Sequence, residues 1–206
     1  MTTPIPDTDL DTDLDAVETP SLRGYGLFLA VTASVALAAA LILVHDKITL
    51  LENPGETLNC DISAFVSCGG VLTQPQAEVF GFANPLMGIV GFSILAAFGV
   101  LLASGGTLPH WFWGGLQVGV LFGIGFVTWL QSQSIYVIEL LCPWCMVVWA
   151  MMIPIFVVTT GQVLRQYAPG AALTRFVNDW RVLIIALWFV ALVSLIWFKF
   201  GDTLWA

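Results

Sequence analysis

Charged residues are scarce in this sequence, and the shortage limits what the protein can be. Asp, Glu, Lys and Arg together make up 10% of its 206 residues, whereas hydrophobic residues make up 58%. Soluble domains usually contain about 25% charged residues. The six Lys and Arg residues form no basic patch of the kind that binds nucleic acid, and no phosphate-binding loop motif is present. The composition therefore argues against a soluble domain and favours an integral membrane protein.

Long apolar stretches account for most of the chain. The hydrocarbon core of a bilayer is about 30 Å thick, so a helix that crosses it needs about 20 mostly apolar residues. Five stretches meet this requirement with almost no charge in their interiors: residues 24–44, 85–104, 111–131, 140–160 and 182–200. The sequence therefore predicts an all-α membrane protein with five transmembrane helices.

The basic residues, although few, predict how the chain is oriented. Five crossings place the two termini on opposite sides of the membrane, and loops rich in Lys and Arg remain in the cytoplasm. Four of the six basic residues lie on the side of the N-terminus: Arg23, Arg165, Arg175 and Arg181. Lys47 and Lys199 lie on the opposite side. We therefore expect the N-terminus to be cytoplasmic.

The formal net charge of −8 comes largely from an acidic segment before the first apolar stretch. This segment, residues 1–22, has too few apolar residues to form a core, so we expect a disordered cytoplasmic tail. We do not expect a cleaved signal peptide, because its leading region would be basic and its apolar stretch would be much shorter than residues 24–44.

Cysteine is also rare, and its four copies occur as two pairs. Cys60 and Cys68 lie in the connection after the first apolar stretch, and Cys142 and Cys145 form the motif CPWC at the start of the fourth. Both pairs therefore reach the same face of the membrane, which the predicted orientation places outside the cytoplasm. Disulfides persist in that compartment, and sulfurs in the first turn of a helix are favoured as thiolates.

Three kinds of site are compatible with four cysteines in this arrangement. They could bind structural zinc as four thiolates, although the seven-residue gap in CDISAFVSC is wide for a ligand pair. They could form inert disulfides in a non-enzymatic membrane protein. They could also carry out reversible thiol–disulfide exchange. The position of CPWC at the membrane edge favours exchange, because a dithiol there can meet both aqueous thiols and a lipid-soluble oxidant such as a quinone.

Three segments, in this order, resemble the vitamin K epoxide reductase family, and specifically its bacterial members that oxidise thioredoxin-like proteins: CDISAFVSCGGVL, NPLMGIVGF and CPWC. The resemblance implies a four-helix transmembrane bundle around a quinone pocket at residues 23–163, with an extracytoplasmic cysteine loop at residues 45–83. Residues 164–206 would form a cytoplasmic loop and a fifth transmembrane helix outside the bundle. The implied activity is that of a thiol:quinone oxidoreductase of the bacterial inner membrane that uses menaquinone or ubiquinone.

The resemblance also assigns roles to the cysteines. Cys142 and Cys145 resemble the active-site pair, with Cys145 facing the quinone, and Cys60 and Cys68 resemble the pair that shuttles electrons to it. Many bacterial relatives carry a thioredoxin-like domain after the bundle, but the 45 residues after Gly161 are too few for one. We therefore expect a separate DsbA-like protein as the electron donor.

Three more residues are candidates for the site or its surroundings. Asn84 either caps the second transmembrane helix or, as the resemblance suggests, donates a hydrogen bond to a quinone carbonyl. Trp149 stands where the animal enzymes have a tyrosine, and its ring could stack on the quinone. Asp61, beside Cys60, we interpret as a solvated loop charge rather than as a catalytic base.

Glycines recur on one face of the third apolar stretch, at Gly115, Gly119 and Gly123. Small residues four apart let a neighbouring helix approach closely in a membrane. We therefore expect helix packing at this face, with clearance for a ligand as the alternative.

Overall fold

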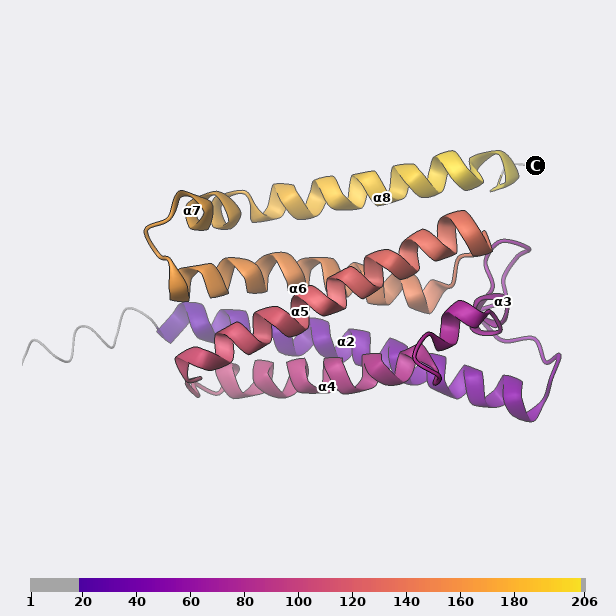
Figure 1. The fold of residues 1–206 in the computed structure, drawn as a ribbon, viewed down its shortest axis with the longest axis horizontal. Coiled ribbons are helices and arrows are strands. Elements are labelled where there is room, and N and C mark those ends of the chain that lie inside the picture. Colours follow the sequence, from indigo (N-terminus) through magenta and orange to yellow (C-terminus); the bar gives the residue numbers. More distant parts are fainter. Residues whose placement is uncertain (1–18, 205–206) are drawn as a thin grey trace, which may run out of the picture.

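The structure is a computed structural model that describes residues 19–204, where the regular elements are helical apart from one isolated β-bridge (Figure 1). The five long helices are α2 (Thr19–Glu52), α4 (Asn84–Ala103), α5 (His110–Gln133), α6 (Pro143–Tyr167) and α8 (Arg181–Leu204). The short elements are α3 (Cys68–Leu72), the 3₁₀ helix η1 (Pro75–Glu78), the π-helical turn η2 (Ser134–Ile138) and α7 (Ala172–Asp179). The expected disordered tail of residues 1–22 is wrong at its end, because residues 19–22 belong to α2. The remainder lies outside the described residues, so its disorder stays a prediction.

The long helices confirm the predicted fold class. Among the described residues, α2, α4, α5 together with η2, α6 and α8 are long and apolar enough to cross a membrane. The beginning of α2 and the short helix α7 lie at one end of the molecule, and α3 and the end of α8 lie at the other (Figure 1). The chain is therefore an all-α, multi-pass membrane protein.

The first helix is longer than the apolar stretch that predicted it. It continues to Glu52, although the sequence suggested an end at residue 44. A charged residue ends a hydrophobic span without ending a helix, and here Lys47 has partners. Its Nζ lies 2.8 Å from Glu78 Oε1 and donates to the backbone oxygen of Leu72 at 2.8 Å. The last two turns of α2 therefore stand beside the loop that carries the first cysteine pair.

Four helices form a bundle, and the fifth lies outside it. α2 packs against α4 and α6, and α5 packs against α6. α8 lies along the outer side of α6 (Figure 1), where Trp188 meets Phe156 edge to face at 6.1 Å between ring centroids. This arrangement agrees with the expected four-helix bundle and additional helix.

The crossing of α2 and α4 depends on glycine. A Cβ atom at Gly26 would collide with the backbone of Ala103, and one at Gly99 would collide with the backbone of Ala30. Small residues allow two helix backbones to approach this closely in a membrane. The α2–α4 pair therefore forms a tight wall of the bundle.

The connection between α2 and α4 begins at residue 53 rather than at residue 45, and we call residues 53–83 the cysteine loop. The backbone N–H of Ser67 donates to the oxygen of Leu141 at 3.0 Å. In return, the N–H of Leu141 donates to the oxygen of Phe65 at 2.8 Å. These bonds hold the cysteine loop against the residues that precede α6, and so they bring the two cysteine pairs together.

Candidate active site

Cys60 and Cys68 form a disulfide in the cysteine loop. Their sulfurs are 2.09 Å apart, and their Cα atoms are 5.6 Å apart. Cys68 is the first residue of α3 and is fully buried, whereas Cys60 keeps 7% of its surface exposed. Cys60 is therefore the more accessible sulfur of this pair.

Asp61 organises the loop around the disulfide. Its carboxylate accepts hydrogen bonds from the Ser67 hydroxyl at 2.7 Å and from the N–H groups of Gly69 and Leu58 at 3.0 and 2.9 Å. Burial alone would raise the pKa of Asp61, but these bonds outweigh it and lower the pKa below its ordinary value. Asp61 is half-buried, and its carboxylate joins Leu58 to the stretch from Ser67 to Gly69. The interpretation of Asp61 as a solvated charge therefore omits this structural role.

The second pair consists of two free cysteines at the start of α6. Cys142 is the N-cap residue, and its sulfur accepts a hydrogen bond from the N–H of Cys145 at 3.4 Å. The pKa of the Cys142 thiol is lowered, mainly by a hydrogen bond from the Cys145 side chain. Burial opposes this effect, and the backbone N–H groups of Cys145 and Trp144 reinforce it. Cys142 is therefore suited to be the thiolate of the pair.

The two pairs meet through Cys68 and Cys142. Their sulfurs are 3.5 Å apart, and both side chains are almost fully buried. Thiol–disulfide exchange requires a thiolate to reach one sulfur of a disulfide. Cys142 is close enough to exchange with the Cys60–Cys68 disulfide after a small displacement.

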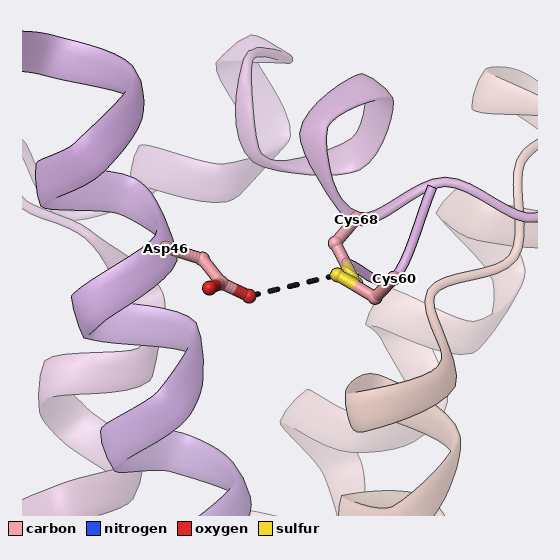
Figure 2. Close-up of side chains that lie close together, drawn as sticks. All are labelled: Asp46, Cys60 and Cys68. Atoms are coloured by element: carbon pink, nitrogen blue, oxygen red, sulfur yellow. Dashed lines mark hydrogen bonds between the residues drawn. A yellow bond between two sulfur atoms is a disulfide. The ribbon is translucent and has the colours of Figure 1, made fainter. Parts of the chain in front are cut away.

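A carboxylate also lies beside the disulfide. Asp46, on the extension of α2, places Oδ2 3.6 Å from the Cys60 sulfur (Figure 2). Asp46, Cys60 and Cys68 have ligand atoms within 4.8 Å of one another. The two sulfurs are bonded to each other, however, so in this state they are not the separate thiolates that a zinc site needs.

An apolar cavity of about 920 Å³ adjoins the second pair. Residues of α4, α5 and α6 form most of its wall, with Ala40 and Leu43 of α2 and parts of the cysteine loop. Cys145 and Trp149 both line it, and Trp149 is only 3% exposed. A cavity of this size and lining is typical of a site for an apolar ring compound.

The glycine face of α5 borders this cavity. A Cβ atom at Gly115 or Gly119 would meet nothing within 4 Å, and Gly91 of α4 opens onto the same space. A Cβ at Gly123 would press on the end of the flexible Met152 side chain. The expectation that these glycines pack against a helix is therefore wrong for Gly115 and Gly119, which leave room in the cavity.

Asn84 lies at the cavity wall but does not cap α4. The N-cap residue is Ala83. The Asn84 side chain donates to the oxygen of Gln76 at 2.7 Å and accepts from the N–H of Val79 at 3.1 Å. Of the two roles considered for Asn84, the cap is wrong, and a hydrogen bond to a quinone stays a prediction.

Sequence reasoning missed two residues of this region, Asp46 and Gln76. Gln76 lines the cavity, and its Oε1 atom is buried without a hydrogen-bond partner among the described residues. In the sequence, Asp46 is explained as a polar residue at the end of an apolar stretch, and Gln76 is explained as a polar residue of a loop. Only the folded arrangement places them next to the cysteines and the cavity.

Comparison with known proteins identifies the family. A model of the vitamin K epoxide reductase family matches residues 27–160, which include α4, α5 and all four cysteines. A comparison with curated proteins gave no match. Members of the family generally use quinones, and the match supports an oxidoreductase that acts on thiols in a membrane. The chain therefore belongs to the vitamin K epoxide reductase family.

Proposed function

We propose that the protein is a thiol:quinone oxidoreductase that reoxidises a DsbA-like or thioredoxin-like partner outside the cytoplasm. The observation that carries this proposal is the 3.5 Å approach of Cys68 to Cys142. It connects a disulfide in a loop with a dithiol beside an apolar cavity. An electron pair can thus pass by sulfur exchange from an aqueous protein to the membrane interior.

The first half of the reaction uses Cys60, the more exposed of the two loop sulfurs. A thiolate of the partner attacks Cys60, forms a bond to its sulfur and breaks the Cys60–Cys68 bond, so that the electron pair passes to Cys68. Cys68 then attacks Cys142 of an oxidised Cys142–Cys145 pair, and Cys145 leaves as a thiolate. A second thiol of the partner attacks the partner's own sulfur and releases Cys60, and the partner leaves with its disulfide formed.

The second half restores the loop disulfide. Cys60 attacks Cys68, the Cys60–Cys68 bond forms, and the Cys68–Cys142 bond breaks with the electron pair on Cys142. The lowered pKa of Cys142 makes it a good leaving group. The structure has the redox state that follows this step, with Cys60 joined to Cys68 and Cys142 and Cys145 free.

The cavity residues fit a quinone. The wall of the cavity is almost entirely apolar and includes Cys145 and Trp149, so a ring bound there could lie near the Cys145 sulfur. A bound quinone supplies an acceptor for two electrons and two protons, which become available when Cys142 and Cys145 form a disulfide. Gln76 Oε1, a buried acceptor that no described residue pairs with, suits a hydroxyl of the reduced ring, and Asn84 is the candidate donor to a carbonyl.

The membrane topology of this proposal follows from the basic residues. We place the N-terminus in the cytoplasm of a bacterial cell, with the protein in the inner membrane and the cysteine loop outside. The redox unit begins at residue 23 and includes α6, which extends it from the expected residue 163 to Tyr167, and the residues after Tyr167 form the cytoplasmic connection and outer helix. The excess of Arg residues on the N-terminal side supports this orientation.

The test is quinone reduction by the purified protein with a DsbA-like protein in its dithiol form as donor. The wild-type protein should form quinol, and Cys145→Ser should form none above background, because it cannot close the pair that gives up the electrons. Quinol formation by Cys145→Ser at the wild-type rate, or none by the wild type, would contradict the proposal.

A further inference from the structure

The Asp46 carboxylate contacts one sulfur of the loop disulfide. Figure 2 shows it extending from α2 toward Cys60, with Oδ2 3.6 Å from the sulfur. Within the described residues, its carboxylate makes no other hydrogen bond. A disulfide sulfur carries no proton, so in this redox state Asp46 Oδ2 and the Cys60 sulfur are in close contact but do not form a hydrogen bond. When Cys60 is a thiol, the same geometry is that of an S–H···O hydrogen bond.

One step of the reaction requires Cys60 to lose a proton. When the second thiol of the partner releases Cys60, the proton of that thiol passes to the Cys60 sulfur. Cys60 is then a thiol, and only its thiolate can attack Cys68. With the cysteine loop placed as in the structure, only 7% of the Cys60 surface is exposed, so few water molecules can take this proton directly. A base in contact with the sulfur would remove this limit.

Among the described carboxylates that contact the loop around the disulfide, Asp46 and Asp61, only Asp46 is available for this proton. Asp61 is the next residue after Cys60, but its oxygens already accept bonds from Ser67, Gly69 and Leu58. Asp46 is half-buried, so a proton that it accepts can continue to solvent.

We propose that Asp46 is the catalytic base for Cys60, which rests on the proposed function of the protein. As the Cys60 sulfur bonds to Cys68, its proton moves to Asp46 Oδ2. The Cys68–Cys142 bond breaks, and the electron pair leaves with the Cys142 sulfur. The two sulfur bonds exchange without an external oxidant, and Asp46 then releases the proton to solvent. In the reverse direction, protonated Asp46 returns the proton to Cys60 as it leaves.

Three other groups act on the charge of Asp46. Burial has the largest effect and disfavours the charge, His45, the preceding residue of α2, favours it, and Asp61 of the cysteine loop disfavours it. Cys142, the leaving sulfur, experiences the charge of Asp46 in turn. The adjacent cation, Lys47, is directed to Glu78 instead. The pH dependence of the step therefore reflects this group of side chains as a whole.

The first test compares Asp46→Asn and Asp46→Glu with Glu52→Gln, which changes an exposed carboxylate at the end of the same helix. At pH 7, Asp46→Asn should turn over at least about tenfold more slowly and accumulate the Cys68–Cys142 disulfide after an acid quench. The rates should converge near pH 9, where thiols ionise without a base. Asp46→Glu should regain part of the activity, and Glu52→Gln should match the wild type.

A second measurement needs neither partner nor quinone, so it separates this inference from the proposed function. The protein is fully reduced, and the alkylation of Cys60 by iodoacetamide is followed against pH by peptide mapping. In Asp46→Asn the midpoint should move to lower pH, because a neighbouring carboxylate disfavours a thiolate. If Asp46→Asn has both a lower pH midpoint for Cys60 alkylation and slower disulfide exchange, Asp46 is a base. A purely electrostatic contact would give the same lower midpoint but faster exchange, because more of Cys60 would be thiolate. An unchanged midpoint, or faster exchange at pH 7, would overturn the role of Asp46.

Discussion

The sulfur of Cys68 lies 3.5 Å from the sulfur of Cys142, although 74 residues separate them in the chain. Cys68 belongs to the cysteine loop, and Cys142 caps the helix that lines the cavity. Backbone bonds between the loop and Leu141 hold the two sulfurs in this position. An exchange between the two pairs therefore needs little movement of the backbone.

Replacing Cys60 by Ala should trap the intermediate that this contact implies. Without Cys60, Cys68 can still attack Cys142, but the loop has no second cysteine to break the new Cys68–Cys142 bond. Non-reducing peptide mapping should then find Cys68 joined to Cys142, and turnover should fall to background. Cys60→Ala combined with Cys142→Ser provides the control, because it lacks the acceptor sulfur and should show no such bond. Full turnover of Cys60→Ala would rule out the shuttle.

Asp61 should make the cysteine loop sensitive to acid. Hydrogen bonds lower its pKa below the ordinary value of 3.8, so the ionised form stabilises the loop above that pH. This stabilisation is lost as the pH falls through the lowered pKa. In Asp61→Asn the bonds to the charge are absent at every pH, and opening of the loop should be easier by about 1 kcal/mol at pH 7.

The measurement for Asp61 is hydrogen exchange at the Leu58 and Gly69 amides, which donate to its carboxylate. Exchange at pH 7 should be about fivefold faster in Asp61→Asn, which corresponds to about 1 kcal/mol. Glu56→Gln changes an exposed carboxylate of the same loop and should leave both amides unaffected. Equal protection in Asp61→Asn and the wild type would mean that the carboxylate does not organise the loop.

Filling the cavity from the glycine face of α5 should weaken quinone binding and leave the fold intact. A leucine at position 119 projects into open space, so Gly119→Leu should raise the KM for quinone about tenfold or more without a lower melting temperature in detergent. Gly125→Leu is the matched control, because Gly125 is on the same helix, has open space around it and does not line the cavity. A parallel rise in KM in both variants would show that the effect is not specific to the cavity.

The helices could be predicted from the sequence because each is marked by its apolar length. The end of α2 could not, since His45, Asp46 and Lys47 mark the end of the hydrophobic span, and the helix continues wherever its polar side chains find partners. The fold class is thus encoded locally. The length of this helix depends on contacts with the loop.

The site was predictable to a smaller extent. The pairing of the cysteines came from motifs that resemble a family, whereas Asp46 and Gln76 carried no local signal. Asp46 matters because it contacts Cys60, 14 residues away in the chain. Gln76 matters because its buried side-chain oxygen has no partner among the described residues. The spacing of Gly115 and Gly119 does not predict their role, because glycines four residues apart suit both helix packing and cavity clearance. Only the neighbouring side chains in the folded protein distinguish the two.

The most direct test of the account follows the four sulfurs through one turnover. Protein with both pairs oxidised is mixed with a reduced DsbA-like partner without quinone, quenched with acid, alkylated and mapped by mass spectrometry. Cys60 and Cys68 should end as a disulfide, and Cys142 and Cys145 should end as thiols. Added quinone should then restore the Cys142–Cys145 disulfide with an equal amount of quinol. Electrons that remain on Cys60 and Cys68, or quinol that forms while Cys142 and Cys145 stay oxidised throughout, would contradict this order of electron transfer.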